Sequence, residues 1–143
     1  MLTENDISYL IRGAAFKVHS LLGPGLLESV YEKALTHELV KAGLLVQNQK
    51  GIPMIYEDFI FDVGFRLDLL VENRVIVEIK SVEVLAEVHH KQLLTYLRLT
   101  NIKLGLLINF NCSDIKQSIV RIVNNLEDFS RRSSQIESQM SLR

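Results

Sequence analysis

The sequence predicts one α/β domain with a mixed sheet flanked by helices, and three features support this prediction. Apolar residues have helical spacing in the first third of the chain. Residues 61–81 contain two runs rich in Val, Ile and Leu around a turn, which is typical of a β-hairpin. Residues 104–110 are continuously apolar, which is typical of a central strand covered on both faces. We therefore expect a sheet of four strands or slightly more.

Two helices are expected at the start of the chain. Thr3 is the expected N-cap of the first, and apolar residues continue at helical spacing from Ile7 to Leu22. The segment Gly23-Pro24-Gly25 breaks this helix. The second helix begins directly afterwards and ends near Gly43, with Glu28 in its first turn, where the helix dipole favours a carboxylate.

The remaining elements follow from alternation and turn residues. The expected strands and helices are, in order, strands at 44–49, 52–56, 59–71 and 75–81, a helix at 86–99, a strand at 104–110, and a last helix capped by Ser113 that carries Ile115, Ile119, Ile122 and Val123. The turn of the hairpin is Glu72-Asn73-Arg74. Residues 127–143 are polar and are expected to form a mobile tail, so the domain should cover residues 1–126.

Composition narrows the class of protein. The chain has 143 residues, 48% of them hydrophobic, which suits one packed domain. The net charge of −1 gives no global attraction to nucleic acid, so any such contact needs a local basic patch. No apolar run approaches the roughly 20 residues that span a bilayer. Cys112 is the only cysteine, which fits a reducing cytoplasm; without an evident histidine partner it is interpreted as a small apolar or loop residue.

The hairpin carries the most informative polar residues. Because strand side chains alternate between faces, Asp68 and Arg66 share one face, while Leu67 and Leu69 share the other. A turn centred on Asn73 places Asp68 opposite Glu78, with β-carbons roughly 5 Å apart. Two facing carboxylates are unfavourable unless something compensates for them.

A divalent cation is one such compensation. Hard cations such as Mg²⁺ prefer oxygen ligands, and Asp68, Glu78 and the carbonyl of Ile79 supply them. Lys80, on the same face as Glu78, could then orient or deprotonate an attacking water or stabilise developing charge. The alternative interpretation is a surface hairpin whose acids and bases pair with each other.

Two helices next to the hairpin carry further polar groups. Glu28 and Tyr31 follow Gly25 at intervals of three on the second helix, and Gln92 and Tyr96 are four residues apart on the later one. Either set also fits an ordinary structural role: Glu28 as a first-turn acid that favours the helix start, and Gln92 and Tyr96 as neighbours of a buried leucine stripe.

Taken together, four segments resemble the bacterial GxxExxY family within the PD-(D/E)XK nuclease superfamily: GPGLLESVYEKAL, FRLDLLVENRVIVEIKS, VHHKQLLTYLR and LGLLINF. The resemblance implies a restriction-endonuclease-like core and a Mg²⁺ or Mn²⁺ site between the hairpin and the second helix. It assigns the superfamily's catalytic positions to Glu28, Asp68, Glu78, Lys80, Gln92 and Tyr96, and metal contacts to Glu28, Asp68, Glu78 and Ile79.

The implied activity is metal-dependent hydrolysis of phosphodiester bonds in nucleic acid, with DNA expected ahead of RNA. Nucleic acid would approach past Arg66, Lys91 and Arg98. The superfamily also contains members that have lost catalysis, so a silent or complex-dependent binding module is the alternative. A homo-oligomer or larger complex is compatible with either, and no membrane contact is expected.

Overall fold

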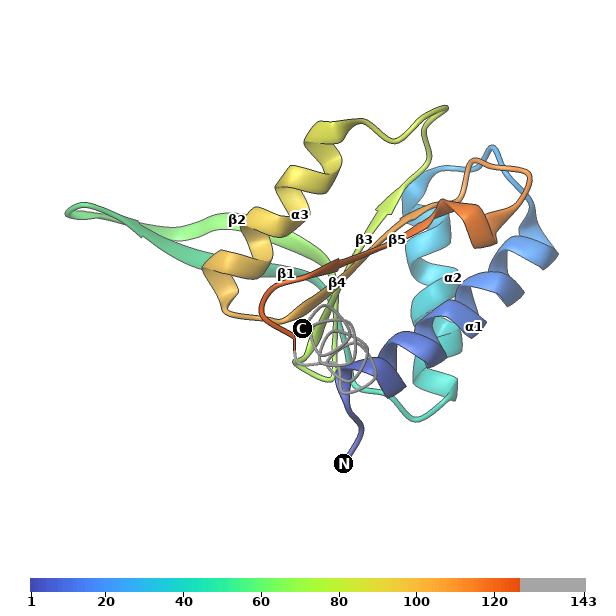
Figure 1. Ribbon diagram of the computed structural model, residues 1–143, viewed down its shortest axis with the longest axis horizontal. Coiled ribbons are helices and arrows are strands. Elements are labelled where there is room, and N and C mark those ends of the chain that lie inside the picture. The colour runs from blue at the N-terminus through green and yellow to red at the C-terminus, as the bar shows by residue number, and fades with distance from the viewer. Residues whose placement is uncertain (127–143) are drawn as a thin grey trace, which may run out of the picture.

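The computed structural model describes residues 1–126, which form a five-stranded sheet with helices on both faces (Figure 1). The elements are α1 (Glu4–Leu22), α2 (Glu28–Lys41), β1 (Val46–Tyr56), β2 (Phe59–Val71), β3 (Val75–Lys80), α3 (Glu87–Thr100), β4 (Leu104–Asn109), the 3-10 helix η1 (Ile115–Ser118) and β5 (Ile119–Val123). The strand order is β1-β2-β3-β4-β5, in which only β3 and β4 run parallel. The predicted α/β class with a mixed sheet is confirmed.

The sheet separates two apolar cores. On one face α1 and α2 pack against the sheet through buried residues that include Ile11, Leu35, Val77, Leu106 and Ile108. On the other face α3 contributes Leu93 and Leu97 to a smaller core with Leu67, Leu70, Ile76 and Leu107. Strands β3 and β4 are buried on both faces, as the continuous apolar run of β4 predicted.

Side-chain hydrogen bonds fix the two N-terminal helices. The Thr3 hydroxyl accepts from the Asp6 N–H at 3.1 Å and the Asp6 carboxylate accepts from the Thr3 N–H at 2.9 Å, which confirms Thr3 as the N-cap of α1. Gly23, with φ of 71°, ends α1. The Tyr31 hydroxyl donates to the Gly23 carbonyl at 2.6 Å and accepts from the Leu26 N–H at 3.1 Å. The interhelical loop, and with it the start of α2, is therefore held by Tyr31.

The hairpin between β2 and β3 has the predicted turn and register. Glu72 and Asn73 both have positive φ, 53° and 54°, and the Arg74 N–H donates to the Val71 carbonyl at 3.0 Å, which closes the turn. Val71 pairs with Val75 and Leu69 with Val77.

Three expectations about the elements are wrong. The two strands expected at 44–49 and 52–56 are one strand, β1, which begins only at Val46. The expected final helix is η1, capped by Asp114 and not by Ser113, followed by β5. The β-branched run after Ser118 pairs with the edge of β4 instead of continuing a helix. The polar tail, residues 127–143, lies outside the described residues.

Leu67 and Leu69 do not share one face, in contrast to the alternation expected along β2. Leu67 packs in the core under α3, whereas Leu69 packs in the core under α1 and α2. The alternation is interrupted where β2 parts from β3 and where Gln49 of the paired strand adopts φ of 48°. Within residues 1–126 no helix is long and apolar enough to cross a membrane.

Candidate functional site

The site begins where β2 and β3 cease to pair. Their ladder ends at Leu69 and Val77, and the next residues are Asp68 and Glu78. The Asp68 N–H donates to Glu78 Oε2 at 3.1 Å, and the Ile79 N–H donates to Asp68 Oδ2 at 2.8 Å. The two carboxyl groups thus accept backbone hydrogen bonds that strand carbonyls would otherwise accept. The sequence-predicted juxtaposition of Asp68 and Glu78 is confirmed.

Glu78 is a buried acid with a strongly shifted proton affinity. Only 4% of the residue is exposed. Burial raises the pKa of Glu78 to about 9, and the hydrogen bond and negative charge of Asp68 act in the same direction. The Asp68 N–H and the positive charge of Lys80 oppose the rise but do not reverse it. In the metal-free protein, Glu78 is therefore expected to carry a proton at neutral pH.

Glu28 connects the first turn of α2 to the end of β3. Its Oε1 accepts from the Ser81 N–H at 3.3 Å, and the Ser81 hydroxyl donates to the Leu26 carbonyl at 2.8 Å. The sequence-based prediction did not assign Ser81 a role. Its position directly after Lys80 was the available signal.

Glu32 and Gln49 complete the polar cluster, and neither was predicted. Gln49 Nε2 donates to Glu32 Oε1 at 2.7 Å and to Asp68 Oδ1 at 3.3 Å. Partial burial raises the pKa of Glu32; the Gln49 hydrogen bond lowers it, and the Asp68 charge raises it further. Glu32 is one helical turn beyond Glu28, so helical spacing could have identified it. The position of Gln49 depends on the irregularity in β1, which the sequence does not reveal.

The point beyond Leu69 and Val77, where β2 and β3 separate, is called the fork of the hairpin. A small pocket lies between α2 and this fork. Its volume is about 210 Å³, and it is lined by Glu28, Ser29, Glu32, Gln49, Asp68 and Ile79. Glu78 does not line this pocket, but its carboxyl group bonds to the backbone of Asp68, which does. Three of the four sequence-predicted metal contacts therefore border one cavity and the fourth adjoins it.

Comparison with known proteins agrees with this geometry. A family model described as the PD-(D/E)XK nuclease superfamily matches residues 5–122. The chain belongs to the PD-(D/E)XK nuclease superfamily. No curated protein and no solved structure gives a significant match. The match confirms the superfamily and the restriction-endonuclease-like fold, whereas membership of the GxxExxY family stays a prediction.

The acids suit the divalent cations that nucleases of this superfamily generally use. Every candidate donor is an oxygen atom: the carboxyl groups of Glu28, Asp68 and Glu78 and the carbonyl of Ile79. Burial, together with the hydrogen bond and charge of Asp68, raises the pKa of Glu78, and a cation bound at the pair would favour the charged form of this carboxyl group. Among residues 1–126 no three His, Cys, Asp or Glu side chains already stand in a metal-binding arrangement. The donor chemistry fits Mg²⁺ or Mn²⁺, although these acids now hold backbone and amide donors.

Lys80 and Tyr96 lie on the Glu78 side of the fork. Lys80 is half-buried at the end of β3, and its charge acts on the Glu78 carboxyl. Tyr96 of α3 stacks on Phe65, with ring centroids 4.5 Å apart. Burial raises the pKa of the Tyr96 phenol, as do the charges of Glu78 and Asp68. Gln92 is exposed one turn earlier on α3, and its side chain makes no hydrogen bond within the described part of the chain.

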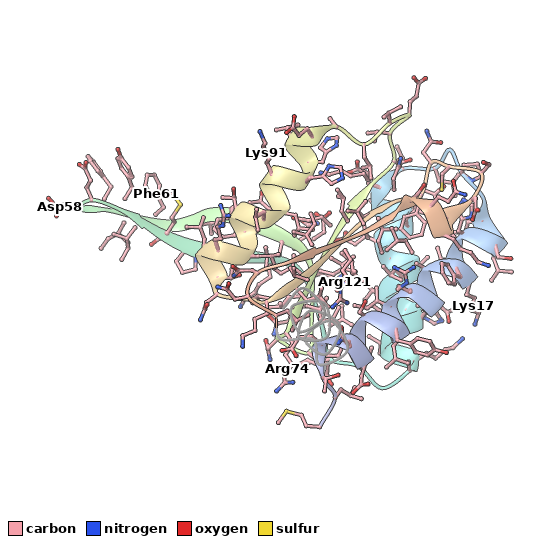
Figure 2. All side chains as sticks on the ribbon, viewed as in Figure 1. Lys17, Asp58, Phe61, Arg74, Lys91 and Arg121 are labelled. Atoms are coloured by element: carbon pink, nitrogen blue, oxygen red, sulfur yellow. The ribbon has the colours of Figure 1, made fainter. Side chains whose placement is uncertain are left out.

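The three basic residues expected to contact nucleic acid lie outside the pocket. Arg66 is exposed on β2, and Arg98 is exposed in the last turn of α3. Lys91, also on α3 (Figure 2), forms an exposed ion pair with Glu87 at 3.3 Å. None of the three lines the acidic pocket, and their contact with nucleic acid stays a prediction.

Cys112 does have a histidine neighbour, in contrast to the expectation. His19 Nε2 lies 3.8 Å from Cys112 Sγ and 2.8 Å from the Cys112 carbonyl oxygen. A carbonyl can only accept, so Nε2 donates to it and cannot take the thiol proton. The thiol itself donates to the Asn109 carbonyl. The pair is structural, as the interpretation of Cys112 as a loop residue implied.

Proposed function

We propose that the protein is a nuclease that hydrolyses phosphodiester bonds with Mg²⁺ or Mn²⁺ held by Asp68, Glu78 and the Ile79 carbonyl. The observation that carries this proposal is the Asp68–Glu78 pair at the fork of β2 and β3, in which Glu78 is buried and Asp68 is half-buried. Bringing two acids together with little access to water is unfavourable, and a cation would compensate for them. When bound, such an ion polarises the scissile phosphate and acidifies a water.

Other residues of the chain would bind the metal ion, position the water or contact the phosphate. Glu28 faces the pocket from α2 and would hold the ion through water or hold a second ion. Lys80 would orient the attacking water or stabilise charge that develops on the phosphate. Gln92 and Tyr96 would steady a phosphate or the Lys80 side chain. Glu32, through Gln49, fixes the orientation of Asp68.

Nucleic acid would be held by its backbone. Arg66, Lys91 and Arg98 supply phosphate contacts from β2 and α3, and DNA is the first substrate to test. The near-neutral charge of the chain implies weak nonspecific binding, so a larger complex could supply further contact.

One observation favours the alternative, a catalytically silent module with a nuclease fold. Each of the three acids already accepts a hydrogen bond from the chain. Backbone N–H groups donate to all of them: Ser81 to Glu28, Ile79 to Asp68, and Asp68 to Glu78. The Gln49 amide also donates to Asp68. Such a network is stable without a cation.

Cleavage of labelled single- and double-stranded DNA and RNA, with Mg²⁺ or Mn²⁺, separates the two functions. Asp68→Asn and Lys80→Ala should each reduce the cleavage rate about 10²-fold or more. Lys103→Ala, which changes an exposed loop lysine between α3 and β4, is the matched control and should cleave like the wild type. Cleavage that persists in Asp68→Asn, or no cleavage of any substrate, would contradict the proposed activity.

A further inference from the structure

The β1–β2 hairpin continues past the body of the sheet as a two-stranded arm (Figures 1 and 2). Phe65, stacked on Tyr96, marks its base, and the turn at Glu57 and Asp58 marks its end. At about 3.3 Å per residue, the strand from Phe65 to Phe59 reaches roughly 20 Å. A two-stranded ribbon of this kind has little stability of its own in water, so its tip is expected to find a partner.

The tip of the arm is both apolar and acidic. Its exposed apolar residues are Ile55, Tyr56, Phe59, Ile60, Phe61 and Val63, and Tyr56 and Phe59 are 61% and 65% exposed. Tyr56 pairs with Phe59 across the strands, and Phe61 follows on the same face. The acids are Glu57, Asp58 and Asp62, and residues 51–65 contain no Lys, Arg or His. An exposed apolar patch of this kind marks an interaction site, and its charge disfavours nucleic acid.

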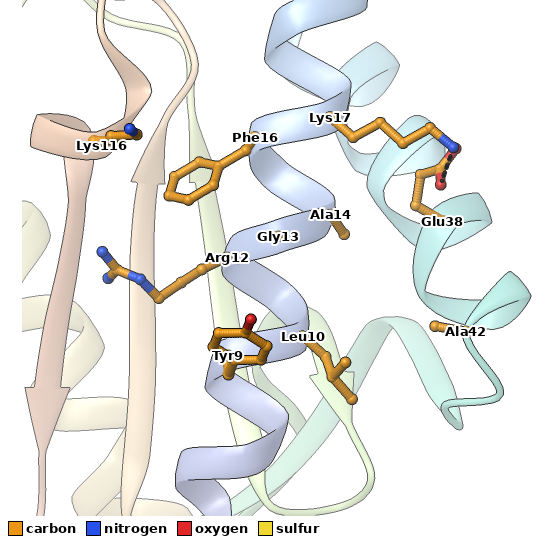
Figure 3. Close-up of a pocket in the computed structure, with 10 residues that line it drawn as sticks. All are labelled: Tyr9, Leu10, Arg12, Gly13, Ala14, Phe16, Lys17, Glu38, Ala42 and Lys116. Carbon is orange, nitrogen blue, oxygen red and sulfur yellow. Dashed lines mark hydrogen bonds and ion pairs between the residues drawn. The ribbon is translucent and has the colours of Figure 1, made fainter.

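A hollow of complementary character lies on the outer side of α1 (Figure 3). Its volume is about 550 Å³, and its lining comprises Tyr9, Leu10, Arg12, Gly13, Ala14, Phe16, Lys17, Glu38, Ala42 and Lys116. Glu38 is the single acid in this lining and is bound by Lys17 at 3.0 Å. Arg12 and Lys116 form no ion pair within residues 1–126. The hollow therefore combines apolar side chains with basic groups.

Gly13 lies at the centre of the hollow. No heavy atom lies within 4 Å of the position that a Cβ would take, so packing within the chain does not require glycine there. Glycine inside a helix costs about 0.5–1 kcal/mol relative to alanine. A bare helix surface at this point is nevertheless what an incoming aromatic side chain would need.

We propose that the arm tip of one copy docks in the α1 hollow of a second copy, and that the contact is reciprocal. The two surfaces are complementary in charge and both carry aromatic rings. They also lie at opposite ends of the molecule, as Asp58 and Lys17 show in Figure 2. Two copies placed antiparallel about a two-fold axis can therefore make both contacts at once, which closes the pair.

The expected contact has the size of a specific interface. Each exposed tip ring offers roughly 100 Å² of surface, by comparison with the 150–250 Å² that a fully buried aromatic side chain contributes. Three rings on each tip, with the matching surface of the hollows, give roughly 1,200 Å² over the two contacts, which is the lower end of the roughly 1,200–2,000 Å² that stable complexes bury in total. The proposal is independent of catalysis, since neither surface includes Asp68 or Glu78.

Charge reversal tests the pairing. Sedimentation of the full chain should show a dimer that weakens as salt rises. Asp58→Lys with Asp62→Lys reverses the tip, and Arg12→Glu with Lys116→Glu reverses the hollow; each double variant should lose at least tenfold in dimer affinity. A mixture of the two variants restores both attractive contacts and should form dimers again. Glu83→Lys and Lys103→Glu, each of which reverses one charge in an exposed loop, are the controls and should associate like the wild type.

Circular dichroism of each variant establishes that it remains folded. A monomeric wild type, or a dimer that survives reversal of the hollow, would overturn the proposal; the second result would indicate contact between arms alone. Larger assemblies would overturn the closed reciprocal pair.

Discussion

Asp68 and Glu78 each accept a backbone N–H from the opposite strand of one hairpin. Glu78 Oε2 accepts from the Asp68 N–H, and Asp68 Oδ2 accepts from the Ile79 N–H. The strands can therefore separate at this point without leaving their N–H groups unpaired. The same exchange places the half-buried Asp68 carboxyl beside the buried Glu78 carboxyl, and this position explains why Glu78 holds a proton tightly.

The proton on Glu78 predicts a pH-dependent stability. Its folded pKa of about 9 lies above its ordinary value of 4.5, so the folded state binds the proton more tightly. This contribution is complete below about pH 4.5 and is lost as pH rises towards 9. The unfolding free energy of the metal-free protein should fall by up to ~1.4 kcal/mol per pH unit in this range, relative to Glu78→Gln. Urea denaturation between pH 5 and 9 measures the difference; parallel curves would contradict it.

Tyr31→Phe should destabilise the fold by about 1–2 kcal/mol, because the hydroxyl holds the Gly23 carbonyl and the Leu26 N–H. The ring and its stack on Phe110 remain. Tyr9→Phe removes the hydroxyl of an exposed tyrosine on α1 and should leave stability within about 0.5 kcal/mol. Equal unfolding midpoints in urea for the two variants would show that the Tyr31 hydroxyl does not hold the loop.

Asn109 holds the segment that follows Lys80. Its buried side chain accepts from the Val82 N–H at 3.1 Å and from the Asn111 N–H at 3.2 Å, and donates to the Val82 carbonyl at 2.9 Å. Asn109→Ala leaves these groups without partners and should cost about 2–3 kcal/mol. Hydrogen exchange should also accelerate at Val82. Gln117→Ala, at an exposed position of η1, is the control. Unchanged hydrogen exchange at Val82 in Asn109→Ala would show that the Asn109 side chain does not hold this segment.

Gly105→Ala should destabilise the sheet. A Cβ at this position would lie 2.9 Å from Leu93 Cδ1, and Leu93 is fully buried. Overpacking of this kind costs about 1–3 kcal/mol. Gly13→Ala, which meets open space in α1, should instead stabilise by about 0.5–1 kcal/mol. Thermal unfolding of both variants checks the opposite signs, and a neutral Gly105→Ala would mean that α3 moves easily on β4.

Local chemistry explains which parts of the fold could be predicted. The Asn73 turn has few permitted registers, so it fixed the pairing of β2 with β3 and brought Asp68 to Glu78. Residues 119–123 have apolar positions that fit a helix or a strand, and only the free edge of β4 decides for a strand. The hydrogen bonds from Gln49 to Glu32 and Asp68 depend on the positive φ of Gln49 in β1, which no residue pattern predicts.

The most direct test of the account is calorimetric titration of Mg²⁺ and Mn²⁺ into the protein at pH 7, in two buffers with different ionisation enthalpies. If a cation replaces the proton of Glu78, wild-type binding should release about one proton per ion, and Glu78→Gln should release almost none. Asp68→Asn should bind at least tenfold more weakly. No binding, or binding whose heat is the same in both buffers, would contradict a metal site at the Asp68–Glu78 pair.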